Sequence, residues 1–257
     1  MSFLKKFFGI KRSLNNNIPV SNRSNGQKEK SGHNIKSISD LENLVKPLLR
    51  QTTKLEIQPP SIPSDRVQFE SHFGSQPYFE KGQKWPSSRD GKYLDFIFQI
   101  VYSPGLELPN NIGLVQFFYD WDEFPWDTEN DGWLVKIYEK VDENKYEFIA
   151  RPDSLKESKY CSVVYKSTQT LPDWEGIDLF ESDASSLSSE LNEGEPWDYY
   201  DRIVNKLVGE QDYQSQLGGY PKWVQGEATP KTNKGNPMKL LFQIDSDDNA
   251  ELMWGDV

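Results

Sequence analysis

The residues best suited to chemistry form an acidic and aromatic stretch near the middle of the chain. Three tryptophans there are interleaved with six carboxylates: Trp121, Trp126 and Trp133 with Asp120, Asp122, Glu123, Asp127, Glu129 and Asp131. Carboxylates beside aromatic faces suit a sugar, a cation or a basic protein. Glycosidase chemistry would require two of them across a cleft, which spacing does not establish. The alternative is a solvated loop whose tryptophans turn into the core.

A second acidic group lies near the end of the sequence. Asp245, Asp247 and Asn249 alternate, and Asp256 follows at the twelfth position of the same stretch. Oxygen ligands at these positions resemble a calcium loop. Such a loop needs glycine at its sixth position, where this chain has Ala250, and we expect a strand rather than a helix before it. A solvated turn is the favoured interpretation, and we assign no metal ligand.

Two glutamines, Gln99 and Gln243, stand inside apolar runs that predict strands. A buried amide must satisfy its donors and its acceptor. One interpretation is that each glutamine pins the glycine-containing loop that precedes its own strand. The other is that both amides line one site between two related halves of the protein.

The sequence lacks the sets of residues that other common catalytic sites require. His33 lies in a linker, His72 stands beside a glycine loop, and Cys161 is the only cysteine. This set supplies neither a closed zinc site nor a serine–histidine–aspartate triad, and no GxSxG or P-loop motif occurs. We assign no catalytic residue and no cofactor, and the sequence favours a protein that is not an enzyme.

Charge divides the chain into two parts. Residues 1–36 hold eight basic side chains and one acid, whereas residues 37–257 have a net charge of −18. A body this acidic repels phosphate backbones, so nucleic acid is not an expected partner, and a basic protein, a cation or a neutral ligand fits better. The lone cysteine, the lack of a secretory signal and the lack of a long apolar run predict a cytoplasmic protein.

The first 36 residues read as a disordered basic tail and linker. Apolar residues at helix-like spacing alternate with lysines over residues 1–12, a pattern typical of weak contact with an anionic membrane surface. The alternative is a tail that keeps the chain in solution. Residues 13–36, rich in Asn, Ser, Gly and Lys, have the composition of a flexible linker.

Hydrophobic periodicity predicts the elements that hold these residues. A capping box at Ser39 and Glu42 predicts a short helix that Pro47 interrupts, and residues 198–210 predict an amphipathic helix. Residues 181–195 are expected to form a surface loop. The strands are predicted over residues 93–101, 113–119, 133–141, 146–149 and 160–165, with a hairpin at 142–144.

An internal repeat relates two of these regions. Residues 72–100 align without a gap to residues 216–244, an offset of 144 positions with eight identities. Most identities are glycines and prolines, which fix a loop path, and each copy ends in the strand sequence FQI. Two copies of one loop-and-strand unit predict a domain with pseudo-twofold symmetry. The strand that follows copy one would begin, in copy two, at Val257, so we expect a C-terminal strand to be missing.

Four stretches resemble the YwqG-like family, a bacterial family without an assigned function. They are FGSQPYFEKGQKWP with FIFQI, GLVQFFYD with DGWLVKIYE, LGGYPKWVQGE, and LLFQIDSDDNAELMWGDV. The resemblance covers residues 40–257. It implies a β-rich α+β fold with duplicated halves and no catalytic residues. In that family a further glycine and an aromatic strand follow MWGD, in agreement with the missing strand.

The sequence therefore predicts one β-rich α+β domain over residues 37–257, with internal duplication and a few helices. Its favoured function is a non-enzymatic protein-binding module for a basic partner, for example an immunity protein that neutralises a basic toxin. The alternatives are a glycan- or calcium-binding protein or a carboxylate-based hydrolase, and a peripheral membrane protein. The candidate binding residues are Gln99, Gln243, Asp120, Trp121, Asp122, Trp126, Asp245, Asp247, Trp254 and Asp256.

Overall fold

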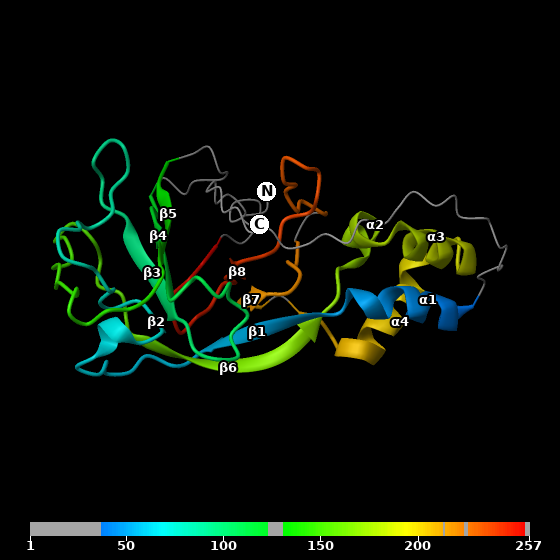
Figure 1. The fold of residues 1–257 in the computed structure, drawn as a ribbon, viewed down its shortest axis with the longest axis horizontal. Coiled ribbons are helices and arrows are strands. Elements are labelled where there is room, and N and C mark those ends of the chain that lie inside the picture. The colour runs from blue at the N-terminus through cyan, green and yellow to red at the C-terminus, as the bar shows by residue number, and fades with distance from the viewer. Residues whose placement is uncertain (1–36, 123–130, 213, 224–225, 255–257) are drawn as a thin grey trace.

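Eight antiparallel strands form one curled sheet in the computed structural model, which describes residues 37–122, 131–212, 214–223 and 226–254. The strand order across the sheet is β5-β4-β3-β2-β6-β1-β7-β8. The strands are β1 (Arg50–Ile57), β2 (His72–Phe73), β3 (Asp95–Val101), β4 (Leu114–Tyr119), β5 (Trp133–Tyr138), β6 (Cys161–Thr170), β7 (Gln216–Gly218) and β8 (Phe242–Gln243). The long pair β1 and β6 forms the floor from which β3, β4 and β5 rise (Figure 1).

The register on the two sides of this central pair is the same. Strand β2 pairs with β6 on one side and β7 pairs with β1 on the other. His72 lies opposite Gln99 in the first unit, and Gln216 lies opposite Gln243 in the second, 144 residues later. The isolated bridge of Ser87 with Tyr93 has its counterpart 144 residues on, between Lys231 and Pro237.

The main core lies inside the curl of the sheet. Phe98 of β3 and Phe242 of β8 meet there edge to face, with ring centroids 5.1 Å apart at 85°. Phe117 of β4 packs 6.0 Å from each of them. Aromatic side chains bury large areas, so this cluster joins the two arms of the sheet into one body.

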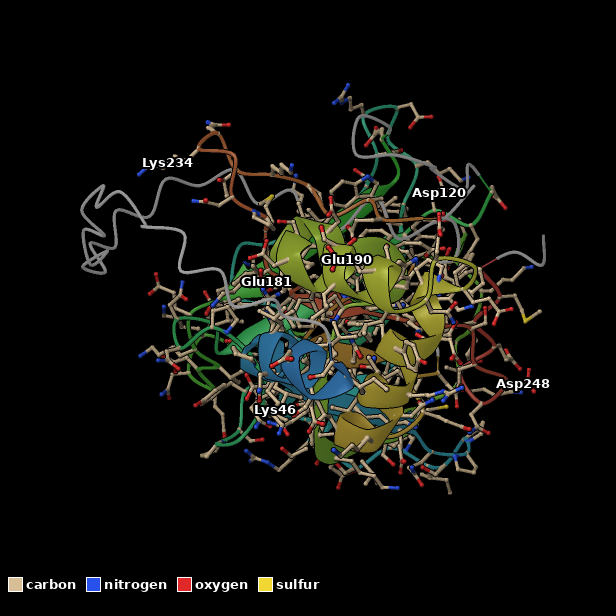
Figure 2. All side chains as sticks on the ribbon, turned by 90° about the vertical axis from the view of Figure 1, so that its right-hand side faces the viewer. Lys46, Asp120, Glu181, Glu190, Lys234 and Asp248 are labelled. Carbon is tan, nitrogen blue, oxygen red and sulfur yellow. The ribbon has the colours of Figure 1, made fainter. Side chains whose placement is uncertain are left out.

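Four α-helices occur among the described residues: α1 (Ile38–Val45), α2 (Ile177–Phe180), α3 (Ser182–Leu191) and α4 (Pro196–Val208). Short 3₁₀ turns are η2 (Lys46–Leu48), η3 (Val67–Phe69) and η4 (Trp174–Gly176). The α-helices pack together around a second core at one end of the sheet (Figures 1 and 2). Of the helices in the described ranges, none is long and apolar enough to cross a membrane.

The structure is a single, mostly-sheet domain with four described helices, so the predicted β-rich α+β class is confirmed at this level. Strands β3, β4, β5 and β6 and helix α4 occur where periodicity predicts them. The first helix is also present, but its cap is Ser37, whose Oγ accepts a hydrogen bond from the backbone N–H of Asp40. The capping box predicted at Ser39 is therefore wrong by two residues.

Two further predictions of local structure are wrong, and strands β1, β2 and β7 were not predicted. Residues 181–195, expected as a loop, contain α3, whose buried Ala184, Leu187 and Ser188 face the helical core. The predicted strand 146–149 and its hairpin are absent, and Tyr146 forms only an isolated bridge with Glu80. Strand β1 was missed because its Thr, Lys and Glu residues mask the alternation. The tail expected over 1–36 lies outside the described residues.

Candidate functional site

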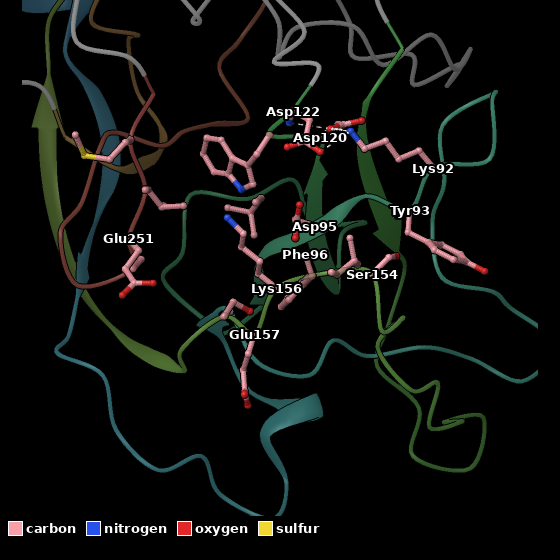
Figure 3. A pocket seen from close by; sticks show the side chains of 18 residues that line it. Lys92, Tyr93, Asp95, Phe96, Asp120, Asp122, Ser154, Lys156, Glu157 and Glu251 are labelled. Carbon is pink, nitrogen blue, oxygen red and sulfur yellow. Dashed lines mark hydrogen bonds and ion pairs between the residues drawn. The ribbon is translucent and has the colours of Figure 1, made fainter.

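A cavity of about 440 Å³ brings together several segments that are far apart in the sequence (Figure 3). Its walls come from the start of β3 and the turn before it, from residues 120–122 at the end of β4, from the segment 154–158, and from the C-terminal segment 250–253. The two acidic regions singled out in the sequence, 120–131 and 245–256, thus both contribute to one concave site. Concave pockets with a few convergent polar groups are the usual form of ligand sites.

A lysine bridges two carboxylates at one wall of the cavity. Lys92 Nζ lies 2.8 Å from Asp120 Oδ1 and 2.9 Å from Asp122 Oδ2. Asp120 is only 2% exposed, whereas the side chain of Asp122 is 84% exposed. The hydrogen bond to Asp120, and then that to Asp122, raise the pKa of Lys92 well above its usual value, and the same lysine lowers the pKa of Asp122. Lys92 and Asp122 are therefore both charged at neutral pH.

Asp95 is the third carboxylate of the cavity. It opens β3 directly opposite Tyr119, the residue before Asp120, so the sheet register places it near the Lys92 bridge. Burial raises the pKa of Asp95, and the negative charges of Asp120 and Asp122 raise it further. A cation or a hydrogen-bond donor entering the cavity would be stabilised by this carboxylate.

The cavity lining also contains the indole of Trp121, which packs against a second tryptophan. The ring of Trp121 lies 4.7 Å from that of Trp254, with an angle of 32° between the planes. Trp254 also packs edge to face on Tyr119 at 5.4 Å and is almost fully buried. Trp121 lines the cavity and Trp254 supports it from behind. An indole face beside carboxylates can hold the stem of a basic side chain or the face of a sugar.

Of the other predicted residues, Asp245 and Asp247 lie in the turn after β8. Asp247 Oδ1 accepts from the backbone N–H of Ala250 at 3.1 Å, and Asp245 Oδ1 accepts from that of Ser246 at 2.9 Å. These carboxylates hold their own turn, and the described residues contain no group of three His, Cys, Asp or Glu suited to a metal ion. Trp126 and Asp256 lie outside the described residues.

The two glutamines are buried and bind the backbone of their own units. Gln99 Oε1 accepts from Tyr78 N–H at 2.9 Å, and its Nε2 donates to the Glu70 carbonyl at 2.7 Å. Gln243 Oε1 accepts from Lys222 N–H, also at 2.9 Å. Each amide thus binds backbone in the loop before its own strand, as the first interpretation describes, and Phe98 and Phe242 meet edge to face in the main core.

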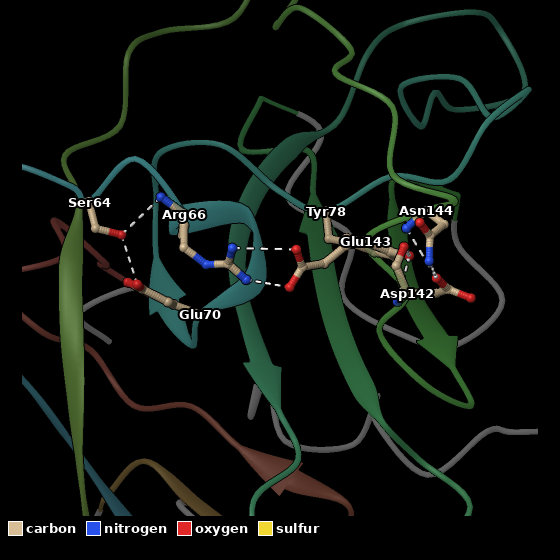
Figure 4. A network of polar contacts seen from close by, with 7 residues as sticks. All are labelled: Ser64, Arg66, Glu70, Tyr78, Asp142, Glu143 and Asn144. Atoms are coloured by element: carbon tan, nitrogen blue, oxygen red, sulfur yellow. Dashed lines mark hydrogen bonds and ion pairs between the residues drawn. The ribbon is translucent and has the colours of Figure 1, made fainter.

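A polar network outside the cavity connects Arg66 and Tyr78 with the 142–144 turn (Figure 4). The Tyr78 hydroxyl donates to the Asp142 carbonyl at 3.0 Å and accepts from the Asp142 N–H at 3.1 Å. Arg66 pairs with Glu143, and both side chains are more than half exposed. Such a pair contributes little to stability, so the network positions the 142–144 turn rather than forming a site.

Sequence reasoning did not find Lys92, Asp95 or Lys156 among the cavity residues. Lys92 and Asp120 are 28 residues apart, and only the β3–β4 register brings them together. The sequence repeat could have drawn attention to Lys92 and Asp95, because the residues aligned with them, Asn236 and Lys239, differ from them in charge. The charge differs at both aligned positions, since Lys92 corresponds to a neutral residue and Asp95 to a basic one.

Comparison with known families gives one match. A family model described as "Domain of unknown function (DUF1963)" matches residues 71–257, which is more than half of the chain. The match includes the whole cavity lining and both repeat units. No curated protein matches the chain.

Proposed function

The chain belongs to the DUF1963 family, a family of unknown function, and from the geometry of its cavity we propose that it is a binding module for a basic protein partner. The observation that carries the proposal is the cavity itself, whose lining contains both the half-buried carboxylate of Asp95 and the indole of Trp121. Such a pair suits a lysine or arginine side chain, because the aromatic face covers the alkyl stem while the carboxylate meets the charge.

The distribution of charge supports the same kind of partner. Residues 171–212, which contain α2, α3 and α4, hold twelve acidic and two basic side chains. Glu181 and Glu190 lie on the face of this helical end that Figure 2 shows. An acidic surface of this size accelerates the encounter with a basic partner and does so less at high salt. The helical end would attract the partner, and the cavity would provide the specific contact.

A titration with defined peptides tests the proposal. Calorimetry would compare a lysine- and arginine-rich peptide with a glutamate-rich peptide of the same length, each at low and at moderate salt. We expect binding of the basic peptide only, weaker as salt rises, and quenching of tryptophan fluorescence on binding. Trp121→Phe should lose the fluorescence response. Equal binding of both peptides, or of neither, would contradict the proposal.

A second candidate, a glycan-binding protein or carboxylate-based hydrolase, is favoured by one observation. The raised pKa of Asp95 is the property that a general acid needs, and Trp121 offers a face for a sugar ring. A change of tryptophan fluorescence on adding neutral oligosaccharides, absent with basic peptides, would favour this candidate over the first.

We also infer that residues 72–100 and 216–244 are two copies of one unit and that the chain is YwqG-like within its family. Matching strand registers, matching bridges and the paired roles of Gln99 and Gln243 support the duplication. The buried lone thiol of Cys161 suits a reducing compartment, so we expect the partner to be met in the cytoplasm.

A further inference from the structure

We infer that a lysine side chain of the partner binds where the ammonium group of Lys92 lies in the free protein. The partner's lysine displaces Lys92 when the complex forms. The inference rests on the proposed function and names its recognition element. Asp120 and Asp122, which bind the Lys92 ammonium in the free protein, would recognise the partner's lysine.

The position of Lys92 makes such an exchange feasible. It stands at the end of a tight turn in which Ser88 N–H donates to the Lys92 carbonyl at 2.8 Å and Gly91 has a φ of +88°. The turn fixes the backbone, while the side chain is 36% exposed at the wall of the cavity. Only side-chain torsions must change for the ammonium to leave the carboxylates.

The geometry of the bridge favours lysine over arginine as the incoming group. One Nζ atom reaches single oxygens of two different carboxylates, Asp120 Oδ1 and Asp122 Oδ2 (Figure 3). A compact ammonium with three donors suits two separate acceptors, whereas a guanidinium prefers both oxygens of one carboxylate. The stem of the incoming lysine would lie in the cavity against Trp121, a contact that gives the partner its advantage over Lys92.

The exchange keeps an ammonium group beside the carboxylate of Asp120. Asp120 is buried, so an exchange that left it without a cation would be unfavourable. Replacing one ammonium by another keeps the carboxylate compensated throughout. In the second repeat unit the residue aligned with Lys92 is Asn236, which cannot hold this place.

Affinity measurements on Lys92→Gln test the inference. The probe is a peptide with one lysine among neutral residues, compared with the same peptide carrying arginine or norleucine, and calorimetry reports the Kd. Lys84→Gln is the matched control, because Lys84 is an exposed lysine of the same repeat unit that does not line the cavity. We expect Lys92→Gln to bind the lysine peptide at least tenfold more tightly than the wild type and Lys84→Gln to bind like the wild type.

A second variant covers the case in which Lys92→Gln does not fold. Lys92→Ala should have a lowered Tm that n-butylammonium restores, while the wild-type Tm does not respond to this amine. Wild-type binding with no tighter binding by Lys92→Gln, or no rescue of Lys92→Ala, would overturn this inference and leave the proposed function standing. If none of the proteins bound any basic peptide, the proposed function would fail together with it.

Discussion

The two proposed repeat units have matching turns but differ in the residues that they present. In residues 72–100 and 216–244 the paired glycines Gly74 and Gly218 have φ values of +63° and +66°, and the hydrogen bonds that close the two turns match position by position. The first unit supplies Lys92, Asp95 and Phe96 to the cavity, whereas the second has Asn, Lys and Leu at the aligned positions.

The positions that are identical in the two segments set the backbone path, whereas positions that differ line the cavity. Seven of the eight identical pairs lie outside the cavity lining, and the exception, Gly74, contributes backbone only. The shared residues set the loop path and the strand register, and the residues that differ set the charge of the surface. Substitutions at shared positions should therefore change stability, and substitutions at differing positions should change binding.

The largest effect is expected at the first shared glycine. A Cβ on Gly74 would collide with the carbonyl oxygen of Lys159, a backbone atom that cannot move aside, and would also be strained by the positive φ. Gly74→Ala should lower the free energy of unfolding by about 4 kcal/mol. Gly82→Ala, with a positive φ but open space around it, should cost only about 1 kcal/mol. Chemical denaturation measures both, and equal losses would contradict the steric explanation.

The shared glutamines should give the next effect and should differ in size. Gln99→Leu would leave the buried Tyr78 N–H and the Glu70 carbonyl without their partner and should cost about 3 kcal/mol, whereas Gln243→Leu removes contacts to Lys222 alone and should cost about 2 kcal/mol. Urea denaturation of both variants measures the difference. A larger loss for Gln243→Leu would reverse the expected order.

Of the aligned residues His72 and Gln216, only the histidine should contribute to the pH dependence of stability. Burial lowers the pKa of His72 to about 4, while the aligned residue, Gln216, does not titrate. Between pH 6.5 and 4 the unfolded chain binds a proton that the folded chain does not, so stability falls as the pH falls through this window, by about 3 kcal/mol in total. His72→Gln, which copies the second unit, should remove this part of the loss. Denaturation midpoints at several pH values would show it, and an unchanged slope in the variant would count against a buried neutral His72.

The smallest effect is expected for the exposed pair of Arg66 with Glu143. Arg66→Ala should leave the Tm unchanged within error, because solvent and salt screen a pair of this kind. Differential scanning calorimetry checks it. A drop of several degrees in the Tm would show that the network in Figure 4 contributes more to stability than its exposure suggests.

Sequence patterns predicted the parts of the fold in which one segment carries its own signal. The aromatic strands, helix α4 and the 144-residue repeat are of this kind. Helix α3 was missed because its serines resemble a loop, although Ala184, Leu187 and Ser188 have the spacing of a buried helical face. Asp120, Trp121 and Asp122, which line the cavity, were among the candidate binding residues. Lys92 and Asp95 were not, because their place in the lining depends on strand register, which no local pattern specifies.

The most direct test of the cavity as the binding site is the affinity of Asp122→Asn for the basic peptide. Asp122 is exposed, so the variant should fold normally, and Glu190→Gln in α3 serves as a control that removes one charge from the helical end. We predict at least a tenfold loss of affinity for Asp122→Asn and a loss below twofold for Glu190→Gln. Equal small losses in both variants would contradict the account, because binding would then follow total charge rather than the cavity.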